Sequence, residues 1–287
     1  MTRLDLSGDQ GPSRRRAVAM DAPATSPRDV LVIVHRPETN PGAVGHWLRA
    51  NGYRLDVRCP RYGCELPETM ERHAGAIVFG GPMSANDPDD YIKREIDWLD
   101  VPLREGKPYL GICLGAQMLA KNLGAKVAFH PQGYVEVGYY GIQVGEEAEE
   151  GLPPFPACVY QWHCEGFDLP QGAEHLAGGG VFENQAFRYG PAAYGVQFHP
   201  EMTLAMIHRW TTVAAHRFAQ PGARPRHEHF EAHHMHGPRI RNWLANFMSA
   251  WVAKGAGAEA KRPRKAAEAS APTLQTLRCQ PSAEMPG

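Results

Sequence analysis

Short apolar runs and helical spacing alternate along the first third of the chain. Residues 29–34 form a continuous β-branched run, which is typical of a strand buried in a parallel sheet. Residues 42–50 then place apolar side chains on one helical face, and residues 54–57 alternate as a second strand does. A third apolar run, residues 74–79, ends in the glycine turn 80–84. This order predicts strands that are joined by helices.

The same rhythm continues to residue 123. An amphipathic helix is expected at residues 91–99, a short apolar strand at 108–112 and a helix at 117–123. Together these segments predict an α/β fold of the flavodoxin-like kind, with an open, mostly parallel sheet and helices on both faces.

Beyond residue 125 the pattern changes to short β-like runs between Gly and Pro turns. The runs are residues 126–129, 135–144, 157–163 and 193–198. They predict a small mixed or antiparallel extension of the sheet. Helical patterns follow at residues 201–218 and 238–252.

Composition predicts the domain boundaries. A chain of 287 residues is long enough for one sizeable α/β core. Residues 1–28, rich in Arg, Asp, Ser, Pro and Gly, predict a disordered leader. Residues 29–252 carry the periodic patterns and predict one folded domain, and residues 253–287 predict a disordered tail.

Charge and cysteine usage narrow the choice of partners. A net charge of −1 gives no electrostatic case for nucleic acid or an anionic membrane. No apolar run approaches the roughly 20 residues that cross a bilayer. The six cysteines are sparse and irregularly spaced, which favours the reducing cytoplasm over a disulfide scaffold. We therefore expect a cytoplasmic protein that binds neither nucleic acid nor membrane.

Metal and cofactor signals are weak. Cys59 and Cys64 lack a second pair of ligands, so a structural zinc is disfavoured. The histidine-rich segment 216–237 invites a metal hypothesis, but a solvated loop between two helices is the favoured interpretation. The basic run 261–265 is best interpreted as part of a solvated tail. Since no phosphate-binding glycine fingerprint is present either, we expect no metal and no cofactor.

Cys113 stands in a pattern that suits a nucleophile. It ends an apolar strand, it has glycines two residues before and after it, and a helical segment follows at once. Flanking glycines allow the sharp turn of a nucleophile elbow, and a helix N-terminus favours the thiolate. This segment alone would fit a buried structural cysteine equally well, so its partners must decide.

A base and an orienting acid occur later in the chain. His199 follows an apolar strand end, and Glu201 comes two residues after it. In extended backbone, residues i and i+2 point the same way, so the carboxylate can lie beside the imidazole and fix its tautomer. Cys113 as nucleophile, His199 as general acid and base, and Glu201 as orienting group then form a predicted triad.

These motifs resemble the triad-type, class I glutamine amidotransferases. The elbow Gly-Ile-Cys-Leu-Gly-x-Gln at 111–117 and the segment Gly-Val-Gln-Phe-His-Pro-Glu at 195–201 carry the resemblance. Further segments in the same order are similar to the free-standing branch related to the glutaminase half of GMP synthase, namely residues 79–82, 161–163, 167–170 and 184–188. The resemblance extends over about residues 29–252.

The resemblance implies hydrolysis of a γ-glutamyl amide through a thioester on Cys113. It assigns the oxyanion hole to the backbone N–H groups of Gly81 and Leu114. It also implies that Gln117 contacts the glutamine substrate. The segment that would hold the amino-acid end of the substrate comprises Trp162, His163 and Cys164.

That segment departs from the family pattern, which usually reads His-Gly-Asp-Thr-Phe where this chain has His-Cys-Glu-Gly-Phe at 163–167. Cys164 would be strained if its φ were positive, because that region favours glycine. The departure bears on substrate identity or affinity more than on the chemistry. A second thiol near Cys113 also raises the hypothesis of a disulfide on oxidation.

Three functions are compatible with these motifs. The first is a glutaminase that supplies ammonia to a synthetase partner. The second is a hydrolase of other small γ-glutamyl compounds, such as peptides or amines, with the same triad. The third is a catalytically idle binding module, which an intact set of Cys113, His199 and Glu201 argues against.

Overall fold

The computed structural model describes residues 28–144 and 152–260 of the chain. The expected leader, up to residue 27, and the expected tail from residue 261 onward lie outside the described residues.

The first half of the fold follows the predicted alternation closely. Its elements are β1 (Asp29–Ile33), α1 (Gly42–Ala50), β2 (Arg54–Arg58), the 3₁₀ turn η1 (Pro60–Tyr62), β3 (His73–Val78), α2 (Asp90–Trp98), α3 (Asp100–Arg104), β4 (Tyr109–Ile112) and α4 (Leu114–Asn122). The short helix α3 and the 3₁₀ turn η1 are the elements among these that the sequence pattern did not predict.

The second half adds strands and then two helices. Its elements are β5 (Val127–Phe129), β6 (Glu136–Val144), β7 (Cys158–His163), β8 (Glu165–Phe167), β9 (Glu174–Gly179), β10 (Asn184–Tyr189), β11 (Ala193–Val196), α5 (Leu204–Val213), the 3₁₀ segment η2 (Ala215–Ala219) and α6 (Arg226–Ala260).

One large sheet organises the described part of the chain. Its strand order is β2-β1-β3-β4-β11-β10-β9-β6-β7, and β5 pairs with β8 in a separate small sheet. The neighbours from β2 to β11 are parallel, whereas β10, β9, β6 and β7 extend the sheet with antiparallel pairs. The predicted α/β fold, with a mostly parallel sheet and an antiparallel extension, is confirmed.

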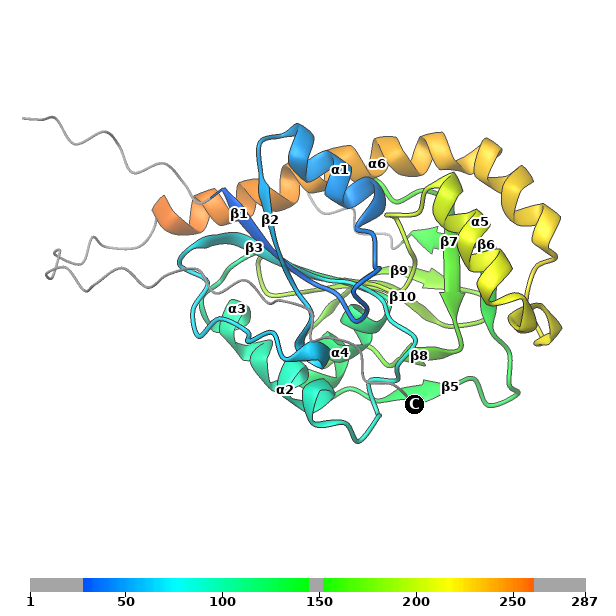
Figure 1. Cartoon of the computed structure of the whole chain (residues 1–287), viewed down its shortest axis with the longest axis horizontal. Helices are drawn as coiled ribbons and strands as arrows, with labels where there is room; N and C mark the ends of the chain where they lie inside the picture. The colour runs from blue at the N-terminus through cyan, green and yellow to red at the C-terminus, as the bar shows by residue number, and fades with distance from the viewer. Residues whose placement is uncertain (1–27, 145–151, 261–287) are drawn as a thin grey trace, which may run out of the picture.

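Two hydrophobic cores lie on opposite faces of this sheet. Val30 and Val32 of β1 point toward α1 and α6, while Leu31 and Ile33 point toward the core beneath α2 and α4. Figure 1 shows the same layers, with α1 and α6 along one face and α2, α3 and α4 along the other. Because successive strand residues face opposite ways, the continuous apolar run of β1 fits burial on both faces.

The prediction of a loop at residues 216–237 is wrong over most of that range. Helix α6 begins at Arg226 and runs through Pro238 to Ala260, so the expected helix at 238–252 is only its middle part. The first turns of the helix hold two buried histidines, His229 and His233, which contact tyrosines of the sheet. These tertiary contacts stabilise helix in a segment whose histidine content suggests a solvated loop.

The far end of α6 also passes the expected domain boundary at residue 252. Gly255 is buried against the sheet, where an added Cβ would lie 2.8 Å from the carbonyl oxygen of Ala74. The helix therefore still packs on the fold at Gly255, and residues 253–260 belong to it rather than to the expected tail.

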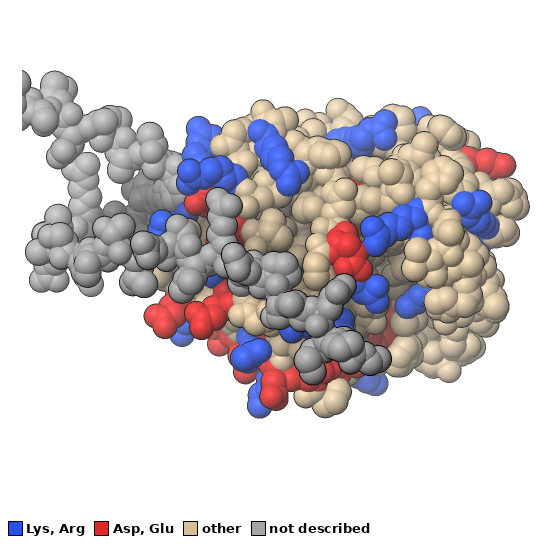
Figure 2. Space-filling model, viewed as in Figure 1, with Lys and Arg blue, Asp and Glu red and all other residues tan. Residues whose placement is uncertain are grey.

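The surface carries charges of both signs. Exposed Asp90, Asp97 and Asp100 belong to α2 and α3, and Figure 2 shows acidic side chains along the lower edge of the viewed face, where these helices lie. Lys and Arg side chains are spread over the rest of that face (Figure 2). Within residues 28–144 and 152–260, no helix has the length and apolar character to cross a membrane.

Candidate active site

Cys113 occupies a strained turn between β4 and α4. Its backbone has φ 52° and ψ −105°, and it is the one non-glycine residue with positive φ among the described residues. Such a conformation costs on the order of 1–3 kcal/mol and persists only where the surrounding structure imposes it. The sharp turn predicted from the spacing of the glycines is therefore present.

Both elbow glycines are required by close packing. A Cβ on Gly111 would lie 2.5 Å from backbone atoms of Gly115, and a Cβ on Gly115 would lie 2.1 Å from the carbonyl oxygen of Val78 in β3. Helix α4 can therefore start directly against the sheet. Its first turn closes with hydrogen bonds from the N–H groups of Ala116 and Gln117 to the Cys113 carbonyl, both 3.0 Å.

His199 reaches the elbow from the neighbouring strand. β11 pairs with β4, and the N–H of Cys113 donates to the carbonyl of Val196 at 2.8 Å. His199 follows three residues later, and its Nδ1 lies 2.8 Å from Oε1 of Glu201. The imidazole and the carboxylate are both buried. The arrangement expected from residues i and i+2 is therefore formed.

The side chains of Cys113 and His199 both lie close to Gly80, which follows β3. A Cβ built on Gly80 would lie 2.9 Å from Cε1 of His199 and 3.4 Å from Cβ of Cys113. Both side chains therefore border the same glycine, although they come from segments 86 residues apart (199 minus 113).

The charge state of His199 is set by two opposing effects. Burial lowers its pKa, but the negative charges of Glu201 and the Cys113 thiolate outweigh burial and raise the pKa to about 10. The site thus favours the protonated, imidazolium form of His199. The rings of Trp210 and His199 pack edge-to-face at 90°, with the centroids 5.0 Å apart.

Gln117 and His163 meet at one carbonyl. The side-chain amide of Gln117 donates to the Glu165 backbone oxygen at 2.9 Å, and Nδ1 of His163 donates to the same oxygen at 2.9 Å. Gln117 also donates to Oε1 of Gln197 at 3.2 Å. The elbow helix is therefore joined to Glu165, the first residue of β8, next to the segment that carries His163.

Trp162 and Cys164 flank His163, the last residue of β7. Trp162 packs among aromatic rings, including Trp210 at 5.6 Å between centroids. Cys164 is partly exposed, its thiol is free and its φ is not positive. The cysteine found where the family usually has glycine is therefore not strained.

Several polar residues around this site were not singled out from the sequence. Oε2 of Glu136 lies 2.9 Å from Nε2 of His163 and accepts from Nε2 of Gln185 at 2.8 Å, and Ser84 donates to Oε1 of Glu165 at 2.9 Å. Glu136 and Ser84 gave little signal, because each is an isolated polar residue, the first at the start of β6 and the second in the turn after β3.

A second group missed by the sequence is the pair His35 and Glu95. His35 follows β1 and contacts the turn after β3. A polar residue just beyond a buried parallel strand can mark a site, and this was the signal that the sequence offered.

Within the described residues, no cluster of three or more His, Cys, Asp or Glu side chains could hold a metal ion. In the same part of the chain, no disulfide joins Cys59 to Cys64.

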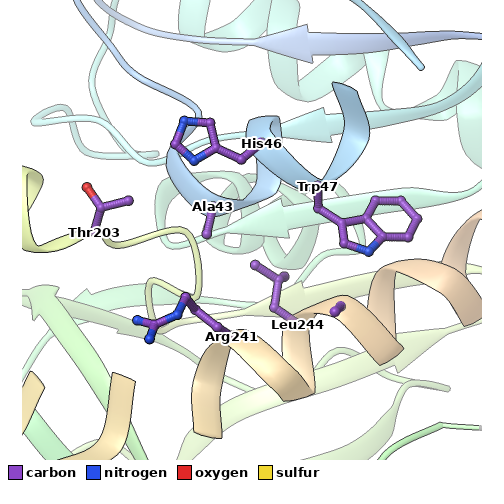
Figure 3. A pocket seen from close by; sticks show the side chains of 7 residues that line it. Ala43, His46, Trp47, Thr203, Arg241 and Leu244 are labelled. Carbon is purple, nitrogen blue, oxygen red and sulfur yellow. The ribbon is translucent and has the colours of Figure 1, made fainter. Parts of the chain in front are cut away.

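A separate pocket lies between α1, α6 and the turn after Glu201 (Figure 3). Figure 3 shows its lining, which is Ala43, His46, Trp47, Thr203, Arg241, Leu244 and Ala245. Its α1 wall is tied to the proposed triad, because the N–H of Ala43 donates to the Glu201 carbonyl at 2.8 Å. The triad side chains themselves do not line it.

A flavodoxin-like sheet with a cysteine elbow at the end of a central strand thus defines the structural class of the protein. The chain belongs to the class I glutamine amidotransferase family, whose model matches residues 40–209, more than half of the chain.

Relatives in sequence agree with this assignment. A glutamine amidotransferase-like protein of Salmonella typhimurium, YfeJ, is 28% identical over 187 residues, which are 62% of this chain and 77% of the relative. A subunit of the glutamine-hydrolysing GMP synthase of Ignicoccus hospitalis is 33% identical over 166 residues, covering 56% of this chain and 85% of that relative. The GMP synthase of Porphyromonas gingivalis is 34% identical over 153 residues, but the match covers only 29% of its length.

Solved structures share the fold. A glutamine amidotransferase from Thermotoga maritima superposes with a TM-score of 0.70 at 28% identity, covering 78% of this chain and 97% of that one. A glutamine amidotransferase from Methylobacillus flagellatus gives a TM-score of 0.74 at 24% identity, covering 80% of this chain and 96% of that one, and shows the common fold.

Proposed function

We propose that this protein hydrolyses the γ-amide of glutamine to glutamate and ammonia, with Cys113, His199 and Glu201 as the catalytic triad. The observation that carries the proposal is the strained Cys113 elbow, which borders the same glycine as the buried His199–Glu201 pair. We place the catalytic domain at residues 29–252 together with the last turns of α6 up to Ala260, and this range contains the family match at 40–209.

The first half of the reaction forms a thioester. The Cys113 thiolate attacks the side-chain carbonyl carbon of glutamine, and the carbonyl oxygen becomes an oxyanion. The N–H of Leu114 is free to donate to it, since the first amides of a helix have no partner within the helix. The N–H of Gly81 is the second proposed donor. When the tetrahedral intermediate collapses, His199 gives its proton to the departing nitrogen and ammonia leaves.

The second half returns the enzyme to its starting state. His199, now neutral, takes a proton from a water molecule, and the resulting hydroxide attacks the thioester carbonyl. Glutamate leaves, and Cys113 is released as the thiolate beside a protonated His199. Glu201 stays ionised and holds Nδ1 of His199, which keeps Nε2 available for the proton transfers.

Substrate binding is assigned to the two segments that meet at the Glu165 carbonyl. Gln117 lies one helical turn after the nucleophile, where it can contact the glutamine side chain. Trp162, His163 and Cys164 would hold the amino-acid end of the substrate. The bonds from His163 to Glu136 and Glu165 fix this segment before any substrate arrives.

The ammonia would pass to a synthetase partner. The support for this step is the likeness to a relative that is named as one subunit of a GMP synthase. The chief alternative is hydrolysis of other γ-glutamyl compounds, and the departure at Cys164 is the observation that favours it.

Ammonia release from glutamine tests the reaction. The wild-type protein should release ammonia, and Cys113→Ala should abolish release. Cys158→Ala is a matched control, because this thiol is also free but begins β7 outside the proposed site. Equal turnover by wild type and Cys113→Ala would refute the mechanism. Faster Cys113-dependent cleavage of γ-glutamyl peptides or amines than of glutamine would favour the alternative substrate class.

A further inference from the structure

A buried His–Glu pair stands beside the proposed triad. His35 follows β1 and is 0% exposed, and Glu95 in α2 is 1% exposed. Nε2 of His35 lies 2.9 Å from Oε2 of Glu95. Burial of two ionisable groups is costly, and the mechanism above uses neither of them.

The other ring nitrogen of His35 contacts the oxyanion turn. Nδ1 lies 3.2 Å from the backbone carbonyl oxygen of Gly80. A carbonyl can only accept a hydrogen bond, so Nδ1 must carry a proton and donate it. Glu95 is compatible with this tautomer in both possible proton arrangements: the carboxylate accepts from a protonated ring, or the carboxylic acid donates to Nε2.

This hydrogen bond fixes a peptide plane. The peptide that joins Gly80 to Gly81 contains both the carbonyl held by His35 and the N–H of Gly81. Within the described residues no peptide is cis, and in a trans peptide the C=O and N–H point in opposite directions. A carbonyl held toward His35 therefore turns the N–H of Gly81 away from His35.

The two sides of this peptide have different neighbours. A Cβ on Gly81 would lie 3.0 Å from Cβ and Cγ of His35, whereas a Cβ on Gly80 would approach the His199 ring and Cys113. The peptide is thus placed between the His35–Glu95 pair and the Cys113–His199 pair. Two consecutive glycines allow this close approach, but they also allow the peptide to rotate easily.

We propose that His35 and Glu95 are positioning residues that lock the Gly80–Gly81 peptide with its N–H directed toward Cys113. This inference rests on the proposed function, because it assumes that an oxyanion forms beside Cys113. Without the lock, rotation of the peptide would present the Gly80 carbonyl to the oxyanion and replace an attractive donor with a repulsive acceptor.

Two reactions of Cys113 distinguish the loss of an oxyanion donor from general damage to the site. Acylation by p-nitrophenyl acetate passes through an oxyanion, and its nitrophenolate burst needs no glutamine and no partner protein. Alkylation by iodoacetamide is a direct displacement that forms no oxyanion. Changes to the thiolate or to His199 alter the rates of both reactions. Loss of an oxyanion donor lowers the rate of acylation alone, because only acylation passes through an oxyanion.

The lock predicts a defined pattern among variants. His35→Phe keeps the ring volume but removes the donor, and Glu95→Leu removes the group that orients it. Each should lower the acylation rate by about 100-fold, the loss typical of one oxyanion donor, while the alkylation rate stays within about twofold. Glu95→Gln should restore most of the acylation rate, because its side-chain amide can donate to Nε2 of His35.

His73→Phe is the matched control. His73 is also a buried histidine paired with a carboxylate, Asp56, at 2.9 Å, but it begins β3 at the end of the strand opposite to Gly80. This variant should keep both rates. Circular dichroism and thermal unfolding of each variant verify that the fold is retained.

Several outcomes would overturn the inference. It fails if folded His35→Phe and Glu95→Leu acylate at the wild-type rate, or if acylation and alkylation fall by the same factor. It also fails, together with the proposed mechanism, if wild type gives no more nitrophenolate burst than Cys113→Ala. A normal burst without Cys113-dependent hydrolysis of glutamine or of another γ-glutamyl compound would contradict the proposed substrate alone.

Discussion

The hydroxyl of Tyr160 and Nδ1 of His229 lie 3.0 Å apart, which joins strand β7 to the first turns of helix α6. The opposite nitrogen, Nε2, donates to the carbonyl of Arg224 at 3.1 Å. Burial lowers the pKa of His229, which favours the neutral imidazole, and in that form Nδ1 accepts from the tyrosine. Trp162 packs edge-on against the same ring, with the centroids 5.9 Å apart, so the histidine also supports the proposed substrate wall.

This relationship predicts a loss of stability in acid. Burial lowers the pKa of His229 below its ordinary value of 6.5, so the unfolded state binds more protons than the folded state as the pH falls through that value. The free energy of unfolding should therefore decrease below about pH 6.5. Urea denaturation between pH 5 and 8, at roughly half-unit steps, measures this dependence.

A pair of variants isolates the contribution of that histidine. His229→Phe should flatten the decrease in acid, even though it costs stability at neutral pH by removing the bond to Tyr160. His227→Asn, an exposed position on the same helix, should keep the wild-type slope. The same slope in wild type and His229→Phe would contradict the assignment.

The raised pKa of His199 predicts an alkaline limit to activity. In the proposed mechanism the imidazolium supplies the proton for ammonia, and the Glu201 carboxylate favours the charged ring. Ammonia release by wild type should decline only well above pH 6.5, as the pH approaches about 10. Glu201→Gln should move this decline to lower pH and reduce kcat by about 100-fold or more. A pH profile of kcat that is identical in both proteins would exclude this role for Glu201.

Close packing at the elbow predicts a strong effect of one methyl group. Gly115→Ala would place a Cβ 2.1 Å from the backbone oxygen of Val78, and backbone atoms on both sides leave little room to relax. We expect a destabilisation of about 1–3 kcal/mol, measured by urea denaturation, and slower alkylation of Cys113. Gly180→Ala is the control, because its added Cβ meets no atom within 4 Å.

Cys164 tests the departure from the family pattern. Because its φ is not positive, Cys164→Gly relieves no strain and should leave stability unchanged or lower it by up to about 1 kcal/mol. If the residue contributes to substrate binding, KM should change while kcat stays nearly constant. A clear gain in stability would show that the cysteine is strained after all.

The sequence predicted those parts of the molecule that local patterns determine. β1 and the elbow were recognisable because a buried parallel strand is continuously apolar and a sharp turn needs glycine. Motifs alone predicted that Cys113 and His199 lie together, and the parallel pairing of β4 with β11 places them at one end of the sheet.

Other parts depend on contacts that no local pattern reveals. The start of α6 is helical because His229 and His233 meet tyrosines from β6 and β7, which are distant in sequence. The short strands β8, β9 and β10 lie outside the predicted β-like runs, and β9 ends in Gly178 and Gly179, a residue type that is depleted in strands. His35 and Glu95 were missed because each is an isolated polar residue until the fold places them together.

Helix α6 has a consequence for how this protein can diverge from its relatives. The family match ends at residue 209, whereas α6 begins at Arg226. The helix nevertheless contributes His229 to the wall around Trp162. If Trp162 binds the substrate as proposed, substrate preference can therefore change through substitutions beyond the residues that the family model matches, while the cysteine elbow and the Gly80–Gly81 turn remain as they are.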